Sequence, residues 1–132
     1  MHLIVCLDDR NGMAFNGRRL SRDQAVIAAV LRESAGHRLL AAPYSAALFS
    51  GGTAELRDDY LTAAGPEDFC FDEREDPAPF AGRITAVTVY RWNRHYPSDL
   101  RFRLELSGWR RTVAEEFTGS SHEKITREVY VP

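Results

Sequence analysis

Hydrophobic residues in the first third of the chain change from strand-like to helix-like spacing. Residues 3–7 are a continuous apolar run rich in β-branched side chains, which predicts a buried strand. Residues 8–17 carry two Asn-Gly pairs and predict a loop. Apolar residues then recur at helical spacing from Ala25, behind a capping-box sequence that begins at Ser21. We therefore expect a first helix from Ser21 to about residue 34.

The middle of the chain has short apolar runs in an acidic background. Residues 39–42 and 69–71 predict two short buried strands, and residues 60–64 predict a helical turn. Residues 53–80 hold nine acidic residues against two arginines, a net charge of −7. Within this acidic segment, the acids and prolines of residues 72–79 predict a loop.

The last third of the chain is rich in predicted strands. Residues 84–90 form a strongly apolar strand, and residues 100–106 alternate with period two, so one face should be buried and the other exposed. Residues 109–117 and 124–131 predict an antiparallel pair that closes the fold. Together with the helical segments before them, these strands predict a single α/β domain over residues 1–132.

Composition narrows the class of protein without naming a function. The chain has 132 residues, of which 44% are hydrophobic and 27% charged, and a formal net charge of −2, so nothing overall attracts it to nucleic acid or to an anionic membrane. Cys6 and Cys70 lie within apolar runs and should be buried thiols. The absence of an export signal and of a membrane-spanning run favours a cytoplasmic protein that does not enter the membrane. None of the histidines has metal-ligand spacing, so no metal is expected.

Several short motifs occur in an order that resembles dihydrofolate reductase. The resemblance rests on an apolar run to Val5, a loop Asp8–Gly12, Leu20-x-x-Asp23, Asp99, Trp109, Glu115-Glu116-Phe117 and Glu128-Val129-Tyr130. It implies a three-layer dihydrofolate reductase-like fold with fewer helices than that family has. The central twisted sheet should be mostly parallel, with an antiparallel strand pair at the C-terminal end.

The departures from this family bear more strongly on function. Gly17-Arg18 stands where the family has a Pro-Trp that closes over substrate and cofactor, and Ala42-Pro43 stands where a Gly-Arg binds the extra phosphate of the cofactor. After its fifth strand the family has a Gly-Gly pair that opens a helix and cradles pyrophosphate. This chain has Asp72-Glu73 there, followed by Pro77 and Pro79. The resemblance therefore implies no nicotinamide cofactor and no functional NADPH-dependent reductase.

Three residues are candidates for a retained ligand site. Asp23 matches the carboxylate that holds and helps to protonate the pterin ring in the family, so it is a candidate catalytic and ligand-binding residue. Alternatively, Asp23 is an acid favoured by the helix dipole in a first turn. Ser45 matches a position near the cofactor, or is a helix cap or a surface serine. Arg18 occupies the position of the family's tryptophan and is a third ligand-binding candidate.

Three functions remain open. We favour a binding module for a small heterocyclic ligand or a protein partner over a residual pteridine reductase that uses Asp23. Residues 81–111 have a net charge of +5 with interleaved aromatics, which permits nucleic-acid binding. We favour instead salt bridges from these arginines to residues 53–80, within the chain or in a homo-oligomer. The zinc motif of ribonuclease Z is absent, which argues against that activity.

Two further expectations concern segments whose role depends on packing. Because a helix of the family is missing, part of one sheet face needs another cover, either Phe80 and the loop of residues 72–82 or a second chain. Residues 118–124 hold Ser, His and Glu side by side. Neighbours in a loop rarely form a catalytic triad, so we interpret this segment as a tight turn.

Overall fold

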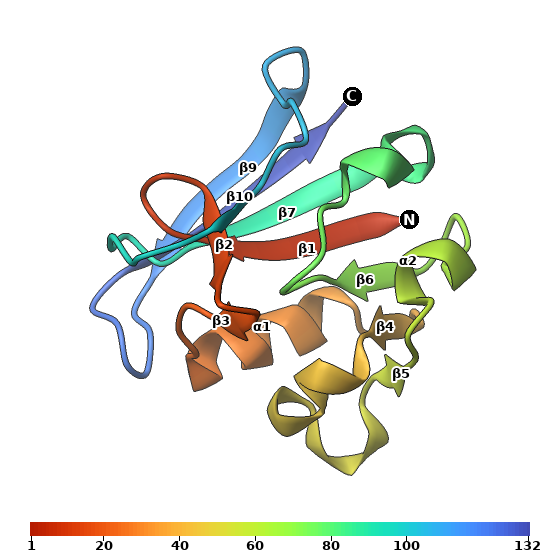
Figure 1. Ribbon diagram of the computed structural model, residues 1–132, viewed down its shortest axis with the longest axis horizontal. Helices are drawn as coiled ribbons and strands as arrows, with labels where there is room; N and C mark the ends of the chain where they lie inside the picture. The colour runs from red at the N-terminus through yellow and green to blue at the C-terminus, as the bar shows by residue number, and fades with distance from the viewer.

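The structure, a computed structural model, describes residues 1–132 and contains a central seven-stranded sheet beside a small three-stranded one (Figure 1). The central strands are β1 (His2–Leu7), β4 (Leu39–Ala41), β5 (Glu55–Leu56), β6 (Phe69–Phe71), β7 (Ala86–Arg91), β9 (Arg110–Phe117) and β10 (Ile125–Val131). Their order in the sheet is β5-β4-β6-β1-β7-β10-β9. All neighbours pair in parallel except β10, which is antiparallel to both β7 and β9. The predicted α/β class and the mixed sheet are confirmed.

The remaining elements are short. The small sheet contains β2 (Gly12–Phe15), β3 (Arg18–Arg19) and β8 (Leu100–Arg101), in the order β3-β2-β8. The α-helices are α1 (Gln24–Glu33) and α2 (Tyr60–Ala63), and the 3₁₀ helices are η1 (Pro43–Leu48), η2 (Ser50–Gly52) and η3 (Ala78–Arg83). None of these helices is long and apolar enough to cross a membrane.

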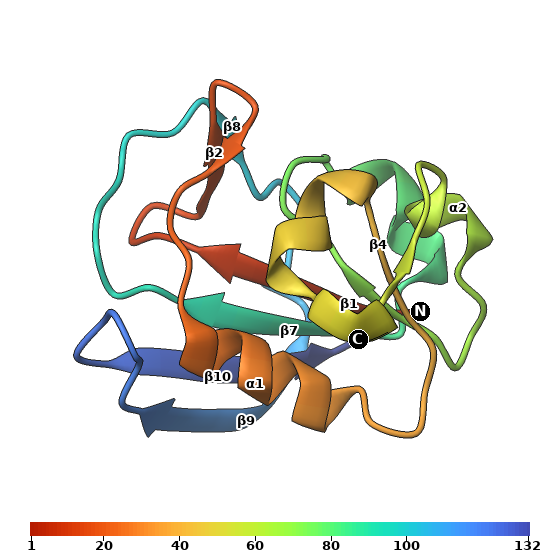
Figure 2. The same cartoon turned by 90° about the horizontal axis from the view of Figure 1, so that it is seen from below.

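The core lies on both faces of the central sheet because neighbouring strand residues point in opposite directions. In β1, Leu3 and Val5 belong to one buried cluster, whereas Ile4 belongs to the other. Helix α1 covers the Ile4 face with an apolar side that includes Val26 and Val30, and Figure 2 shows it alongside β7 and β10. Each strand of the parallel centre is therefore apolar at consecutive positions, as sheets buried on both faces require.

The first helix starts later than the capping-box sequence suggested. Its N-cap is Asp23, not Ser21, and the Asp23 carboxylate accepts hydrogen bonds from the backbone amides of Ala25 and Val26. A helix can begin at whichever polar side chain reaches its first free amides, and a carboxylate is a good acceptor for them. The prediction of a helix here is confirmed, and its start moves by three residues.

The face opposite α1 is covered by irregular chain. Phe80 of η3 is half-buried against the cluster that contains Leu3 and Val5, and residues 102–109 also pack on that cluster. The prediction of a strand over residues 100–106 is wrong beyond Arg101, where β8 ends, because no neighbouring strand is available for pairing. Alternation nevertheless persists: Phe102 is buried, and Arg101 and Arg103 are exposed.

The predictions for residues 8–17 and for the two cysteines can also be compared with the structure. The predicted loop of residues 8–17 contains strand β2, which pairs with β3 and β8 in the small sheet. A Cβ at Gly12 would lie 2.6 Å from Ser98 Oγ, so this position needs glycine for close approach. Both cysteines are free thiols. Cys70 is buried as expected, whereas Cys6 is only partly buried, and burial raises the pKa of the Cys70 thiol to about 12.

Candidate functional site

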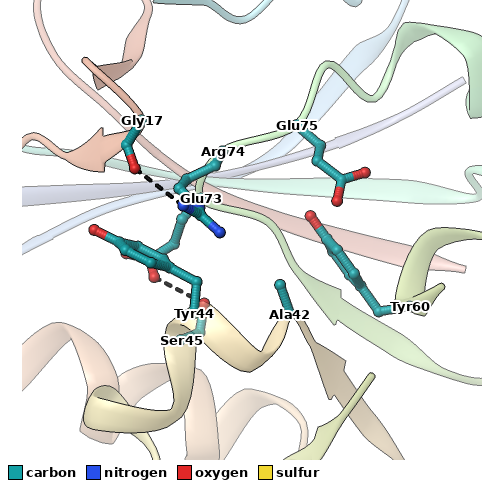
Figure 3. Close-up of a pocket in the computed structure, with 8 residues that line it drawn as sticks. All are labelled: Gly17, Ala42, Tyr44, Ser45, Tyr60, Glu73, Arg74 and Glu75. Carbon is teal, nitrogen blue, oxygen red and sulfur yellow. Dashed lines mark hydrogen bonds between the residues drawn. The ribbon is translucent and has the colours of Figure 1, made fainter. Parts of the chain in front are cut away.

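A small cavity lies at the carboxyl ends of β4 and β6, where the chain leaves the parallel part of the sheet. Its volume is about 190 Å³. The walls come from the loop before β3, from η1, from α2 and from the chain after β6. The lining residues, all drawn in Figure 3, are Gly17, Ala42, Tyr44, Ser45, Tyr60, Glu73, Arg74 and Glu75. Ligands of open α/β sheets bind at the carboxyl ends of strands, so the position itself favours a ligand site.

Glu73 is fixed by partners from two distant parts of the chain. Arg19 donates to both carboxylate oxygens of Glu73, at 2.7 and 3.0 Å, and Ser45 Oγ donates to Oε1 at 2.8 Å. The hydrogen bond to Glu73 raises the pKa of the Arg19 guanidinium. Ser45 therefore lies in the cavity wall as a buried partner of Glu73. The salt bridge to Arg19 balances the charge of the Glu73 carboxylate.

Arg74 and Tyr44 lie beside Glu73 on the same wall, across the cavity from Tyr60 and Glu75 (Figure 3). The Arg74 guanidinium lies 3.7 Å from the centre of the Tyr44 ring and donates one hydrogen bond to the carbonyl oxygen of Gly17. Arg74 has no carboxylate partner among the salt bridges of the chain. Stacking on an aromatic face orients a guanidinium while leaving its remaining N–H groups free to donate.

Asp72 is a buried carboxylate immediately behind the cavity. Tyr60 donates its hydroxyl hydrogen to Asp72 Oδ1 at 2.9 Å, and the Glu75 amide donates to the same oxygen at 3.0 Å. Asp72 Oδ2 is buried and receives no hydrogen bond. Burial raises the pKa of Asp72 from 3.8 to about 7, because a charge here is poorly solvated. Burial likewise raises the pKa of Tyr60, so its hydroxyl stays protonated.

Glu75 completes the site with a free acceptor. Its carboxylate makes no salt bridge, and Figure 3 shows it on the same side as the Tyr60 hydroxyl. Partial burial raises the pKa of Glu75, although the nearby Arg74 opposes that shift. The cavity therefore presents a carboxylate at Glu75 and a guanidinium at Arg74, neither of which makes a salt bridge, and two tyrosine rings within a small volume. Such a set can hold a polar ring-sized group through both donors and acceptors.

Asp23 lies elsewhere and is fully engaged inside the chain. Besides capping α1, its oxygens accept hydrogen bonds from the amides and hydroxyls of Ser120 and Ser121 and from His122 Nδ1. Burial alone would raise the pKa of Asp23, but these donors outweigh it and hold the pKa well below its usual range. A Cβ at Gly119 would overlap the Asp23 carboxylate, so the β9–β10 loop docks closely. Asp23 borders two surface hollows beside Arg22 and Gln24, but its side chain is 0% exposed, so a ligand would have to displace the Ser120 and Ser121 donors to reach the carboxylate.

The loop of residues 118–124 is anchored to the rest of the chain by the contacts of His122. The ring of His122 stacks on Trp92, and its Nε2 lies 3.1 Å from both Ser21 Oγ and Tyr96 Oη. The sequence separates these partners widely, so only packing reveals that Asp23, His122 and Ser21 form a connected chain. The His122 side chain is 2% exposed, and its contacts join three loops to the start of α1.

Arg18 is exposed on β3 and does not line the cavity; its neighbour Arg19 carries the contact to Glu73. Sequence reasoning gave Asp72-Glu73 only a negative role, the loss of a pyrophosphate cradle. It assigned no site to Tyr60, Arg74 or Glu75. The available signal was the apolar triplet of residues 69–71 followed directly by acids, which places charge at the end of a buried strand.

Comparison with solved structures identifies the architecture. The chain superposes on dihydrofolate reductase from Enterococcus faecalis complexed with NADP(H) and RAB-propyl, with a TM-score of 0.68 over 98% of this chain and 94% of that chain. The fold is that of dihydrofolate reductase. Sequence identity is 8%, so the likeness concerns the dihydrofolate reductase fold alone. No protein-family model and no curated protein sequence matches the chain.

The departures within the dihydrofolate reductase fold are concentrated around the cavity. Where the family pattern has Gly-Gly and a helix after this strand, Asp72 is buried, Glu73 is paired with Arg19, and the chain continues to the 3₁₀ helix η3. Nowhere do three or more His, Cys, Asp or Glu side chains gather in a way that could hold a metal ion.

Proposed function

We propose that this chain is a small-ligand-binding domain that keeps the dihydrofolate reductase fold and uses the cavity between Tyr44 and Tyr60 for a small heterocyclic ligand. The proposal rests on two opposite charges, Arg74 and Glu75, which line a cavity at the carboxyl ends of β4 and β6. Neither side chain makes a salt bridge. A flat heterocycle with ring nitrogens offers the donors and acceptors that such a pair can bind.

Size and charge both argue against a dinucleotide in this cavity. Its volume of about 190 Å³ lies below the roughly 300–1,000 Å³ of sites for drug-sized ligands and cofactors, so the cavity has room for a single small ring system and not for a dinucleotide. Three acidic residues, Asp72, Glu73 and Glu75, follow β6 within four positions, where a pyrophosphate would need amide donors. A residual reductase that relies on Asp23 would also need the β9–β10 loop to release that carboxylate.

The proposal is tested by calorimetric titration of the full chain with pterin, adenine, nicotinamide and NADPH. We expect saturable binding of at least one heterocycle and none of NADPH. Arg74→Gln and Glu75→Gln should each weaken the heterocycle about tenfold, the loss of roughly one charge-assisted hydrogen bond. The control Glu67→Gln removes an exposed acid outside the cavity and should change nothing. Saturable NADPH binding, or heterocycle binding that ignores both cavity variants, contradicts the proposal.

A further inference from the structure

Packing places Asp23, His122 and Ser21 in one line of hydrogen bonds. Nδ1 of His122 lies 2.9 Å from Asp23 Oδ2, and Nε2 of the same ring lies 3.1 Å from Ser21 Oγ. A carboxylate, an imidazole and a hydroxyl in this order are the parts of a nucleophilic serine site, which is recognised by geometry and not by sequence position. The serine here lies 101 positions from the histidine and is neither of its loop neighbours, Ser120 and Ser121.

The charge of Asp23 determines which ring nitrogen of His122 carries hydrogen. Burial alone would raise the pKa of Asp23, but the amides and hydroxyls of the β9–β10 loop outweigh burial and keep the carboxylate ionised. An ionised carboxylate only accepts hydrogen bonds, so Nδ1 donates to Asp23. In the neutral ring Nε2 then has a free lone pair that accepts from the Ser21 hydroxyl. The imidazole is therefore oriented as a general base for Ser21.

Exposure increases along this line from the carboxylate to the hydroxyl. The side chains of Asp23 and His122 are 0% and 2% exposed, whereas Ser21 is half-buried. Arg22, the next residue along the chain, lines an open surface hollow of about 350 Å³. The acid and the base are therefore shielded from water, which strengthens their hydrogen bond. Ser21 is the member of the line that a reagent arriving from solvent meets first.

The imidazole ring is held in place by two aromatic neighbours. It stacks on Trp92 with 4.7 Å between the ring centres, and Tyr96 Oη lies 3.1 Å from the same Nε2 that faces Ser21. Because one lone pair serves two hydroxyls, Tyr96 competes with Ser21 for the base. Removal of the Tyr96 hydroxyl should therefore strengthen the pairing of Ser21 with His122.

We infer that Ser21 is a nucleophilic serine that takes an acyl group from a carboxylic ester, with His122 as its general base and Asp23 as a positioning residue. Ser21 Oγ bonds to the carbonyl carbon of the ester, and its hydrogen passes to Nε2 of His122. The bond to the alcohol oxygen then breaks as the same hydrogen passes to the leaving alcohol. Water that gives a hydrogen to Nε2 next attacks the acyl carbon, and the acid departs as Ser21 regains that hydrogen. The site shares no residue with the cavity between Tyr44 and Tyr60, so neither proposal depends on the other.

The test uses the full chain with p-nitrophenyl acetate as the ester and diisopropyl fluorophosphate as a covalent label. We expect a burst of about one p-nitrophenolate per chain. Peptide mass spectrometry should find the phosphoryl group on Ser21, with fluoride released. Ser21→Ala should abolish burst and label, whereas the control Ser107→Ala removes an exposed hydroxyl and should change neither. A burst that persists in Ser21→Ala, or a label on another residue, overturns the inference.

Three further variants separate a reactive network from a purely structural one. His122→Gln and Asp23→Asn should each lower the labelling rate about 100-fold or more, the usual contribution of a general base, while circular dichroism shows an intact fold. Tyr96→Phe removes the competing hydroxyl and should leave the rate equal or higher. An unchanged rate in either of the first two variants, or a slower Tyr96→Phe protein, contradicts the assignment.

A thiol at position 21 provides a test that leaves His122 in place. An imidazole stabilises a neighbouring thiolate, so Ser21→Cys should react with iodoacetamide at about pH 6 roughly tenfold faster than Ser107→Cys, an exposed position. The native Cys6 and Cys70 thiols have pKa values raised by burial and should stay unlabelled. Equal rates for the two variants would mean that His122 does not activate position 21.

Discussion

At the scale of single residues, two buried aspartates show how surroundings decide the protonation state. Asp23 is surrounded by amide, hydroxyl and imidazole donors and keeps its charge in a buried position. Asp72 is equally buried but leaves Oδ2 without a hydrogen bond, so burial raises its pKa to about 7. The same side chain therefore stabilises the fold as an anion at one site and resists ionisation at the other.

Replacing Asp72 by asparagine should stabilise the protein at neutral and alkaline pH. Because the folded-state pKa of Asp72 is raised from 3.8 to about 7, its contribution to stability is full below pH 4 and is lost as the pH rises through 7. Asp72→Asn does not ionise, so its stability advantage should grow from near zero at pH 4 towards an upper limit of about 4 kcal/mol above pH 7. Urea denaturation at several pH values measures this difference.

The control for that experiment is Asp58→Asn, which removes an exposed carboxylate with no salt bridge and should give parallel pH curves. A less stable Asp72→Asn protein at pH 8 would contradict the assignment of Asp72 as a buried acid with a raised pKa.

Asp23→Ala should destabilise the protein by about 3 kcal/mol at pH 7. Loss of the helix cap alone costs roughly 1 kcal/mol, and the buried donors of Ser120, Ser121 and His122 would lose their acceptor. The lowered pKa of Asp23 gives the opposite pH dependence to Asp72: its contribution is present above the unfolded value near 4 and is lost as the pH falls below that value. Thermal denaturation measures the loss, and Gln24→Ala, an exposed first-turn change, should cost little. Equal stability of Asp23→Ala and wild type would contradict the anchoring role.

At the scale of elements, irregular segments cover the sheet face for which sequence alone predicted a missing helix. The 3₁₀ helix η3 places Phe80 on this face, and the crossing segment adds Phe102 and Leu104. The expectation that the chain itself or a second copy must cover the face is therefore met in part by the chain, with a cavity left between the cover and the sheet. Proline at positions 77 and 79 fits a short 3₁₀ helix better than a long α-helix.

If η3 serves as this cover, Phe80→Ala should destabilise the protein by about 2 kcal/mol, because a half-buried aromatic ring loses its apolar contacts. Phe15→Ala is the matched control, since Phe15 is 43% exposed and its truncation should cost under about 0.5 kcal/mol. Urea denaturation of both variants measures the difference. Equal costs for the two would mean that η3 does not protect the face.

At the scale of the whole molecule, charge is separated between an acidic segment, residues 53–80, and a basic segment, residues 81–111. No salt bridge within the chain joins the two segments. The predicted salt bridges from Arg101 and Arg103 to residues 53–80 are absent within the chain. The acids of that segment pair instead with nearer arginines: Arg57 bonds Glu55 and Asp59, and Arg38 bonds Asp68. Pairing with a second copy therefore stays a prediction.

Light scattering after size exclusion tests that prediction. At low ionic strength we expect a fraction of oligomer that declines in high salt, because exposed charges are screened over about 10 Å at 0.1 M. Arg101→Glu/Arg103→Glu should abolish the oligomer, whereas Arg18→Glu/Arg22→Glu, two other exposed arginines, should not. No shift of RNA or DNA is expected at low salt. A monomer under all conditions contradicts self-association, and a nucleic-acid shift that disappears with salt contradicts the choice between partners.

The sequence by itself determined the elements whose pattern is local. Consecutive apolar β-branched residues gave β1 and β7, period two gave the burial of Phe102, and helical spacing gave α1. The order of short motifs also predicted the dihydrofolate reductase fold, which the solved structure confirms at 8% identity. The local elements follow from backbone periodicity, which every residue in a segment repeats, whereas the fold followed from the resemblance of the motifs to the family.

Only the tertiary structure decided which polar side chains meet. Arg19 reaches Glu73 across 54 positions, and His122 reaches Asp23 across 99. Tyr60 and Asp72 come from neighbouring elements, yet whether a carboxylate is paired or orphaned depends on every donor packed around it. No periodicity records such contacts, because each involves one side chain from each element. The protonation of Asp72 and the engagement of Asp23 were therefore set by packing, after the pattern of apolar residues had fixed the sheet.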